Sequence, residues 1–213
     1  MIKSKVIEVF KRFEIENPEP KGELNSVNAY TFLVAVILSA QATDIGVNKA
    51  TEKLFMVADS PEKMVKLGLK KLKNHIKTIG LYNAKAENVI KMSETLIEKY
   101  NSEVPGTMDD LISLAGVGRK TANVVLNIIF SQPTIAVDTH VFRVSNRLGF
   151  AKGDTVEKVE AKLDKIIPPE FKCHAHHWLI LHGRYICKAR NPNCAGCFLN
   201  DLCVSKKLYG SIG

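Results

Sequence analysis

Two helical patterns are joined by a tight turn in the stretch Leu114-Ala115-Gly116-Val117-Gly118-Arg119-Lys120-Thr121-Ala122. Its two glycines tolerate backbone dihedrals that other residues resist, and they let a ligand approach the chain closely. The first amides of the following helix lie at the positive end of its dipole, so the turn can hold a phosphate group. It lacks the spacing of an ATP-binding loop. The stretch predicts a helix-hairpin-helix over about residues 107–131 if the phosphate belongs to a nucleic acid, and an ordinary glycine connection otherwise.

Helical spacing of apolar residues continues from this turn in both directions, and no segment shows sustained alternation with a period of two. We therefore expect an all-α fold with about nine or ten helices. The helices are expected near 6–13, 27–40, 61–68, 83–100, 111–115, 119–130, 138–148, 155–167 and 170–186. The residues expected at helix ends are Asn25 or Ser26, Ser60 with Pro61, Gly68, Asn83, and Thr107 with Asp110 as an acidic variant of the capping box.

The composition gives a second constraint. The 213 residues contain 30 Lys and Arg against 22 Asp and Glu, so the net charge is +8 and the pI is near 9.2. A hydrophobic fraction of 46% is enough for an ordinary core, which excludes a disordered chain or a collagen-like repeat. The positive charge favours a polyanionic partner. The densest apolar run, Phe32 to Leu38, is too short to span a bilayer, so we expect no membrane partner.

Four of the five cysteines form a cluster near the end of the chain, with the spacing Cys-x6-Cys-x2-Cys-x5-Cys. They are Cys187, Cys194, Cys197 and Cys203. Four thiolates from one short loop, residues 187–203, suit a 4Fe-4S cluster, in which each iron binds one cysteine thiolate. Structural zinc usually takes two Cys-x2-Cys pairs, and only one is present. A loose set of reduced surface cysteines is the remaining alternative.

The fifth cysteine, Cys173, falls on a helical pattern, where we expect it to be a small buried residue. Four histidines follow it at positions 174, 176, 177 and 182, with apolar residues between them. They lack a metal-binding His-Glu-x-x-His arrangement, so we interpret them as helix packing and surface hydrogen bonds.

Several stretches together resemble one family. Leu114 to Asn123, Pro133 to Val144 and the cysteine spacing are similar to the endonuclease III family of DNA repair glycosylases. Leu38 to Asp44 and Gly80 to Asn83 resemble further signature stretches of that family, and the likeness runs nearly end to end in unbroken order. Ala115 departs from the pattern, because members often have proline there.

The resemblance implies the helix-hairpin-helix DNA glycosylase architecture, with two helical domains. A six-helix barrel domain is expected at 22–132, and an iron-sulfur cluster domain at 1–21 plus 133–213, with the active-site cleft between them. The implied activity is removal of oxidised pyrimidines from duplex DNA, followed by β-elimination at the abasic site. The implied partner is double-stranded DNA with an oxidised base or an abasic site.

Lys120 and Asp138 are the candidate catalytic pair. A neutral lysine amine can attack the sugar and form a Schiff base, and a carboxylate can stabilise the cationic sugar and move protons. From the residues alone, two simpler interpretations stay open: Lys120 only touches phosphate, and Asp138 only caps the helix beginning near Thr139. The family's Schiff-base lysine and catalytic aspartate fall on these two positions. Adenine-specific relatives that lack the lysine do not cut the strand, so Lys120 indicates the bifunctional branch.

The DNA contacts are predicted on three parts of the chain. By resemblance, Gln41 and Leu81 enter the duplex where the damaged base is flipped out. The hairpin contributes Gly116, Val117, Gly118 and Arg119, and the basic cysteine loop contributes Lys188 and Arg190. We expect a monomer in the cytoplasm, associated with the nucleoid in a bacterium. Two rival functions remain: a related glycosylase with another base preference, and a non-catalytic DNA-binding protein that uses the iron-sulfur loop as a redox sensor.

Overall fold

The computed structural model describes residues 3–209, and in this range the protein consists of helices and connecting loops with no strand. This confirms the all-α prediction. The chain divides into two compact units, Glu23–Phe130 and Met1–Gly22 with Ser131–Gly213. The sequence placed the domain boundaries at 22 and 132. No helix in the described range combines the length and the apolar character that crossing a membrane requires.

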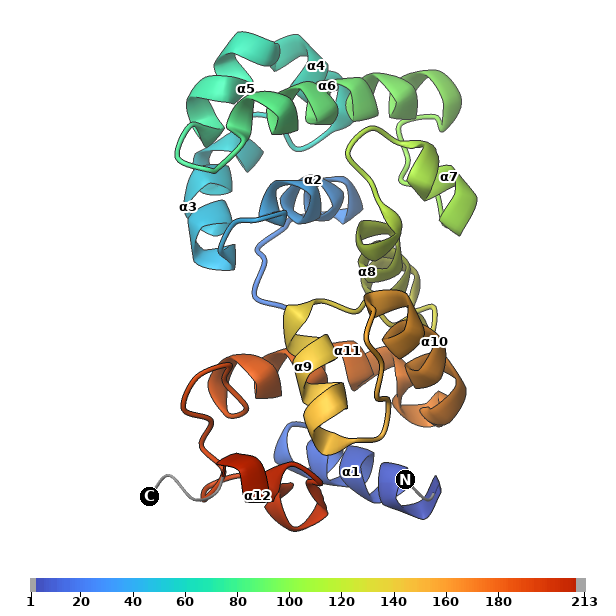
Figure 1. Cartoon of the computed structure of the whole chain (residues 1–213). Helices are drawn as coiled ribbons and strands as arrows, with labels where there is room; N and C mark the ends of the chain where they lie inside the picture. Colours follow the sequence, from blue (N-terminus) through green and yellow to red (C-terminus); the bar gives the residue numbers. More distant parts are fainter. Residues whose placement is uncertain (1–2, 210–213) are drawn as a thin grey trace. The chain divides into compact units, whose positions relative to one another are not determined.

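The unit Glu23–Phe130 is built around the apolar helix α2 (Ala29–Ser39), and nine of its residues are buried. In Figure 1, α2 lies between α3, α6 and α8, and it packs against all three. The other helices of this unit are α3 (Asp44–Phe55), α4 (Pro61–Leu67), α5 (Leu69–Ile76), α6 (Tyr82–Lys99), α7 (Met108–Ser113) and α8 (Arg119–Phe130). This core therefore holds the two hairpin helices α7 and α8 in place.

Helix ends account for most differences between the predicted and observed elements of this unit. The residue that caps α2 is Asn28, not Asn25 or Ser26, because Asn28 and Thr31 form a reciprocal capping box. Helix α6 begins after Leu81, so the prediction of a start at Asn83 was wrong. Thr107 caps α7 as predicted, but the Asp110 carboxylate accepts a bond from the Thr107 hydroxyl and not from its backbone.

Two helices of this unit were not predicted. Helix α3 is capped by Thr43, whose hydroxyl accepts a hydrogen bond from the Gly46 amide. Helix α5 follows Gly68 directly, because the positive φ of 79° at this glycine ends α4 and redirects the chain into a new helix. The described residues contain twelve α-helices, so the expected number of nine or ten was too low.

The other unit brings the first helix together with the last part of the chain. Its helices are α1 (Lys3–Glu16), α9 (Thr139–Leu148), α10 (Val156–Ile166), α11 (Pro169–Tyr185), the 3-10 helix η1 (Asn200–Leu202) and α12 (Lys206–Tyr209). Phe13 of α1 stacks on Trp178 of α11 with ring centroids 6.1 Å apart. The Phe10 ring lies 6.0 Å from Phe13 and 6.3 Å from Trp178. The Trp178 indole also donates to the Asn17 carbonyl at 2.7 Å. This aromatic core fixes α1 against the helix that leads into the cysteine loop.

Candidate active site and cysteine centre

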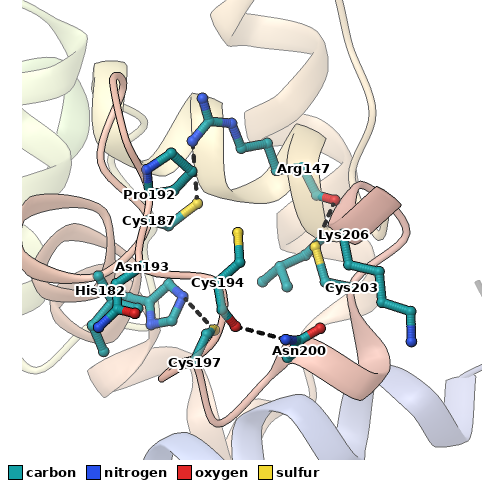
Figure 2. A pocket seen from close by; sticks show the side chains of 12 residues that line it. Arg147, His182, Cys187, Pro192, Asn193, Cys194, Cys197, Asn200, Cys203 and Lys206 are labelled. Atoms are coloured by element: carbon teal, nitrogen blue, oxygen red, sulfur yellow. Dashed lines mark hydrogen bonds between the residues drawn. The ribbon is translucent and has the colours of Figure 1, made fainter. Parts of the chain in front are cut away.

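The four clustered cysteines lie on the wall of one pocket (Figure 2). The chain leaves α11, passes through Cys187, folds back at Cys194 and Cys197, and reaches Cys203 just after η1. Its turns are closed by hydrogen bonds from the Cys197 amide to the Cys194 carbonyl at 3.3 Å and from the Asn200 side chain to the same carbonyl at 2.6 Å. The loop therefore directs its cysteines toward a common space of about 360 Å³, open mouth included.

The chemistry of this pocket fits a multinuclear centre. Burial and, to a smaller extent, the three neighbouring cysteines together raise the pKa of the Cys197 thiol to about 11, and burial also raises the pKa of Cys203. Thiolates in such a place need a positive charge to stabilise them, which a metal centre supplies. The four thiols on one pocket wall therefore fit a metal centre with four thiolate ligands.

Three arginines hold the cysteine loop from outside. Arg12 of α1 donates two bonds to the Asp201 carboxylate, at 2.6 and 2.9 Å, and a third to the Phe198 carbonyl. On α9, Arg147 donates to the carbonyls of Lys188 and Ala189 and approaches the Cys187 sulfur at 3.5 Å. Arg143 donates to the Cys187 carbonyl at 3.0 Å. These contacts join residues that lie 40 to 189 positions apart, so no short spacing in the sequence reveals them.

The two basic residues predicted on this loop are exposed. Lys188 and Arg190 extend into solvent, while the backbone beside them is held by Arg147. Asn191, the next residue, has a left-handed φ of 49°. A fixed backbone with exposed cations suits contacts to phosphate groups.

The histidines after Cys173 have structural partners. His176 is buried and its Nδ1 pairs with the Ala136 carbonyl at 2.8 Å. Burial lowers the pKa of His182 to about 4, and its Nε2 lies 3.7 Å from the Cys197 sulfur. Cys173 is half-buried, not buried as expected, and it contacts the Ser131 carbonyl at 3.7 Å.

The two glycines of the hairpin between α7 and α8 have different roles: the backbone conformation requires a glycine at Gly116, whereas Gly118 faces open space. Gly116 has a φ of +80°, and a side chain there would meet Asn88 at 2.9 Å. Gly118 has no positive φ, and a side chain there would point into open space. Val117 between them is buried and anchors the turn. The first helical bond of α8 joins the Ala122 amide to the Gly118 carbonyl, so the turn presents the amino end of α8 to solvent.

The two catalytic candidates lie in different units. Lys120 is exposed in the first turn of α8. Asp138 is half-buried and caps α9, with Oδ1 accepting from the Val141 amide at 2.8 Å. The capping role weighed for Asp138 is therefore present. The capping bond uses Oδ1, whereas Oδ2 makes no hydrogen bond within the part of the chain that the structure describes.

Gln41 and Leu81 share an unusual backbone conformation. Both have a left-handed φ, 55° and 59°, and both are exposed; Leu81 is 64% exposed. Such a conformation costs a non-glycine residue on the order of 1–3 kcal/mol and persists only where the surroundings impose it. The two loops also lie close together, because a side chain on Gly80 would be 3.9 Å from the Gln41 carbonyl oxygen. An exposed leucine held in this way is a feature that amino-acid spacing does not reveal.

Comparison with known proteins places this site in a family. A model described as HhH-GPD superfamily base excision DNA repair protein matches residues 34–169. Endonuclease III of Haemophilus influenzae is 60% identical over 207 residues, which cover 97% of this chain and 98% of that protein. The chain belongs to the endonuclease III family. Endonuclease III of Escherichia coli K12 is 56% identical, with the same coverage.

The cofactor and fold agree with this membership. A second family model, the iron-sulfur binding domain of endonuclease III, matches residues 187–203, and the cofactor of the protein is a 4Fe-4S cluster. The solved structure of a trapped endonuclease III–DNA covalent intermediate is 45% identical, with a TM-score of 0.91 and coverage of 98% of both chains. A thermostable thymine-DNA glycosylase, 24% identical with a TM-score of 0.85, shares the fold.

Proposed function

We propose that the protein is a bifunctional DNA glycosylase of base excision repair, which releases a damaged base and then cleaves the abasic site by β-elimination. The observation that carries this is Lys120, a primary amine exposed at the start of the second hairpin helix. The family membership supports it, and so does the likeness to a trapped endonuclease III–DNA covalent intermediate, since a covalent intermediate needs a nucleophile.

The proposed reaction uses Lys120 and Asp138. The neutral Lys120 amine bonds to the anomeric carbon as the glycosidic bond breaks, and the base leaves with a proton. Ring opening gives an iminium ion, loss of a proton from the neighbouring sugar carbon expels the 3′ phosphate, and water releases the lysine. The Asp138 carboxylate stabilises the cationic sugar and moves protons, a role for which its Oδ2 is available. The resemblance implies that both residues act on one sugar.

DNA is gripped, in this proposal, by backbone and side-chain groups with separate tasks. The hairpin from Gly116 to Arg119 holds a backbone phosphate at the amino end of α8, where the open position of Gly118 leaves room for it. Lys188 and Arg190 bind further phosphates, and Gln41 and Leu81 fill the space left by the flipped base.

The cluster orders the basic loop. Cys187, Cys194, Cys197 and Cys203 are its proposed ligands, since they share one pocket. When bound, it supplies the cross-link that a loop of this length cannot obtain from apolar packing. In this proposal the exposed cations of the loop bind DNA, and Arg12 and Arg147 support the loop from behind.

The preferred substrates are proposed to be oxidised pyrimidines in duplex DNA, acted on by a monomer in the cytoplasm. A base-release assay on duplexes that each carry one damaged base tests this. Release of oxidised pyrimidines at rates well above those of oxidised purines, alkylated bases or mismatched thymine supports the proposal. A different order of preference supports the rival glycosylase, and binding without release on any duplex supports the redox-sensing DNA-binding protein.

A further inference from the structure

Lys85, in the first turn of α6, is a buried lysine that the proposed reaction does not use. Lys85 is only 5% exposed, and burial lowers the pKa of its ammonium. The Leu38 carbonyl, 2.9 Å from Nζ, is the one hydrogen-bond partner that the described part of the chain gives this ammonium. Burying a lysine is costly, so its position calls for a reason beyond packing.

The ammonium caps the carboxyl end of α2. This end has Ala40 as its C-cap, with a φ of −55°, and the left-handed residue Gln41 follows it. Its last carbonyls find other donors: Val36 accepts from the Ser39 hydroxyl at 2.8 Å, and Ser39 accepts from the Ala42 amide at 3.0 Å. The Leu38 carbonyl accepts from Lys85. A cation at this position also interacts favourably with the negative end of the helix dipole.

The same residue is bonded to the second exposed loop. The Lys85 backbone amide donates to the Leu81 carbonyl at 3.1 Å, the first helical bond of α6. Its side chain reaches the carbonyl three residues before Gln41. One residue thus bonds directly to Leu81 and to the helix end from which the Gln41 loop departs. These are the two loops whose exposed tips have left-handed backbones.

We propose that Lys85 is a positioning residue that fixes the Gln41 loop and the Leu81 loop at one separation, so that both enter a DNA duplex as a single wedge. The inference rests on the proposed function of the two tips. An apolar side chain of similar length at position 85 would fill the same volume but leave the Leu38 carbonyl without a donor. The two loops would then move independently. A displacement of about 1 Å between the two tips is enough to lower the preference for an abasic duplex by one to two orders of magnitude.

The test compares Lys85→Met with Lys91→Met, which removes an exposed lysine from the same helix. Affinity is measured for a duplex with a stable abasic analogue and for the same duplex undamaged, with 2-aminopurine opposite the analogue to report insertion. Strand cleavage is measured on abasic DNA in duplex and in single-stranded form. We expect Lys85→Met to lose about ten-fold in the preference for the abasic duplex, together with the fluorescence change, and to keep the single-strand cleavage rate. Lys91→Met should match the wild type.

Two outcomes overturn the inference. One is a preference in Lys85→Met within two-fold of the wild type, and the other is an equal loss on single-stranded and duplex DNA, which indicates general damage to the fold. If Lys85→Met does not fold, Gln41→Ala, Leu81→Ala and the double variant decide, because these side chains are exposed. A single wedge predicts that the double variant loses less than the product of the two single losses, and a full product refutes it.

Failure of the proposed function gives a different pattern. In that case the wild-type protein itself shows no preference for the abasic duplex and no cleavage. If the wild type prefers that duplex and the single variants at Gln41 and Leu81 weaken the preference while Lys85→Met does not, only the role of Lys85 is wrong.

Discussion

Asp138 has a structural task and a proposed chemical task, and two substitutions separate them. The Oδ1 atom accepts a hydrogen bond from the Val141 amide at 2.8 Å and caps α9. Asparagine caps a helix about as well as aspartate, so Asp138→Asn should keep the stability within about 0.5 kcal/mol of the wild type. Alanine cannot accept this bond, so Asp138→Ala should lose about 1 kcal/mol, roughly 2–4 °C in melting temperature for a chain of this size.

The chemical task depends on the carboxylate charge, which both substitutions remove. Single-turnover release of an oxidised pyrimidine should therefore fall by at least about 10²-fold in both variants. Melting of the cluster-loaded proteins is followed by circular dichroism, and DNA affinity is measured in parallel to show that binding survives. Base release by Asp138→Asn within a few-fold of the wild type would refute the catalytic role. Equal melting of the two variants would refute the capping argument.

Three further predictions concern the hairpin, the cysteine loop and the charge. Gly116→Ala should cost about 1–3 kcal/mol by urea unfolding, because its φ is +80° and Asn88 is in the way; Gly118→Ala should unfold like the wild type but bind DNA more weakly. Arg12→Met should lose its cluster faster in the presence of a chelator, seen as fading visible absorbance, because Asp201 loses its bidentate partner. The affinity for abasic duplex should fall linearly with salt on logarithmic axes, and a flat response would contradict phosphate contacts.

The parts of the fold that the sequence predicts best are those encoded by neighbouring residues. The glycine turn and the spacing from Cys187 to Cys203 lie within short segments, so their geometry follows from local backbone chemistry. Helix α3 was missed because its buried positions depend on packing against α2 and α5. Asn28 was passed over as a cap because its partner, the Thr31 hydroxyl, sits inside an apolar run.

The features that support the candidate site come from tertiary contacts. Arg12 reaches the cysteine loop only because α1 packs on α11, and no sequence pattern in either segment predicts this contact. The buried position of Lys85 is equally hidden, since the basic residues around it read as a solvated helix face. The left-handed backbones of Gln41 and Leu81 are imposed by the helix ends beside them, and neither residue type favours that conformation.

Borohydride trapping on abasic duplex DNA decides whether Lys120 is the nucleophile. The wild-type protein should give a stable covalent adduct with the DNA, because reduction fixes the Schiff base. Lys120→Gln should give none while it keeps its cluster, its melting temperature and most of its DNA affinity, since Lys120 is exposed. Equal trapping by Lys120→Gln, or no adduct with the wild-type protein, would mean that Lys120 is not the nucleophile.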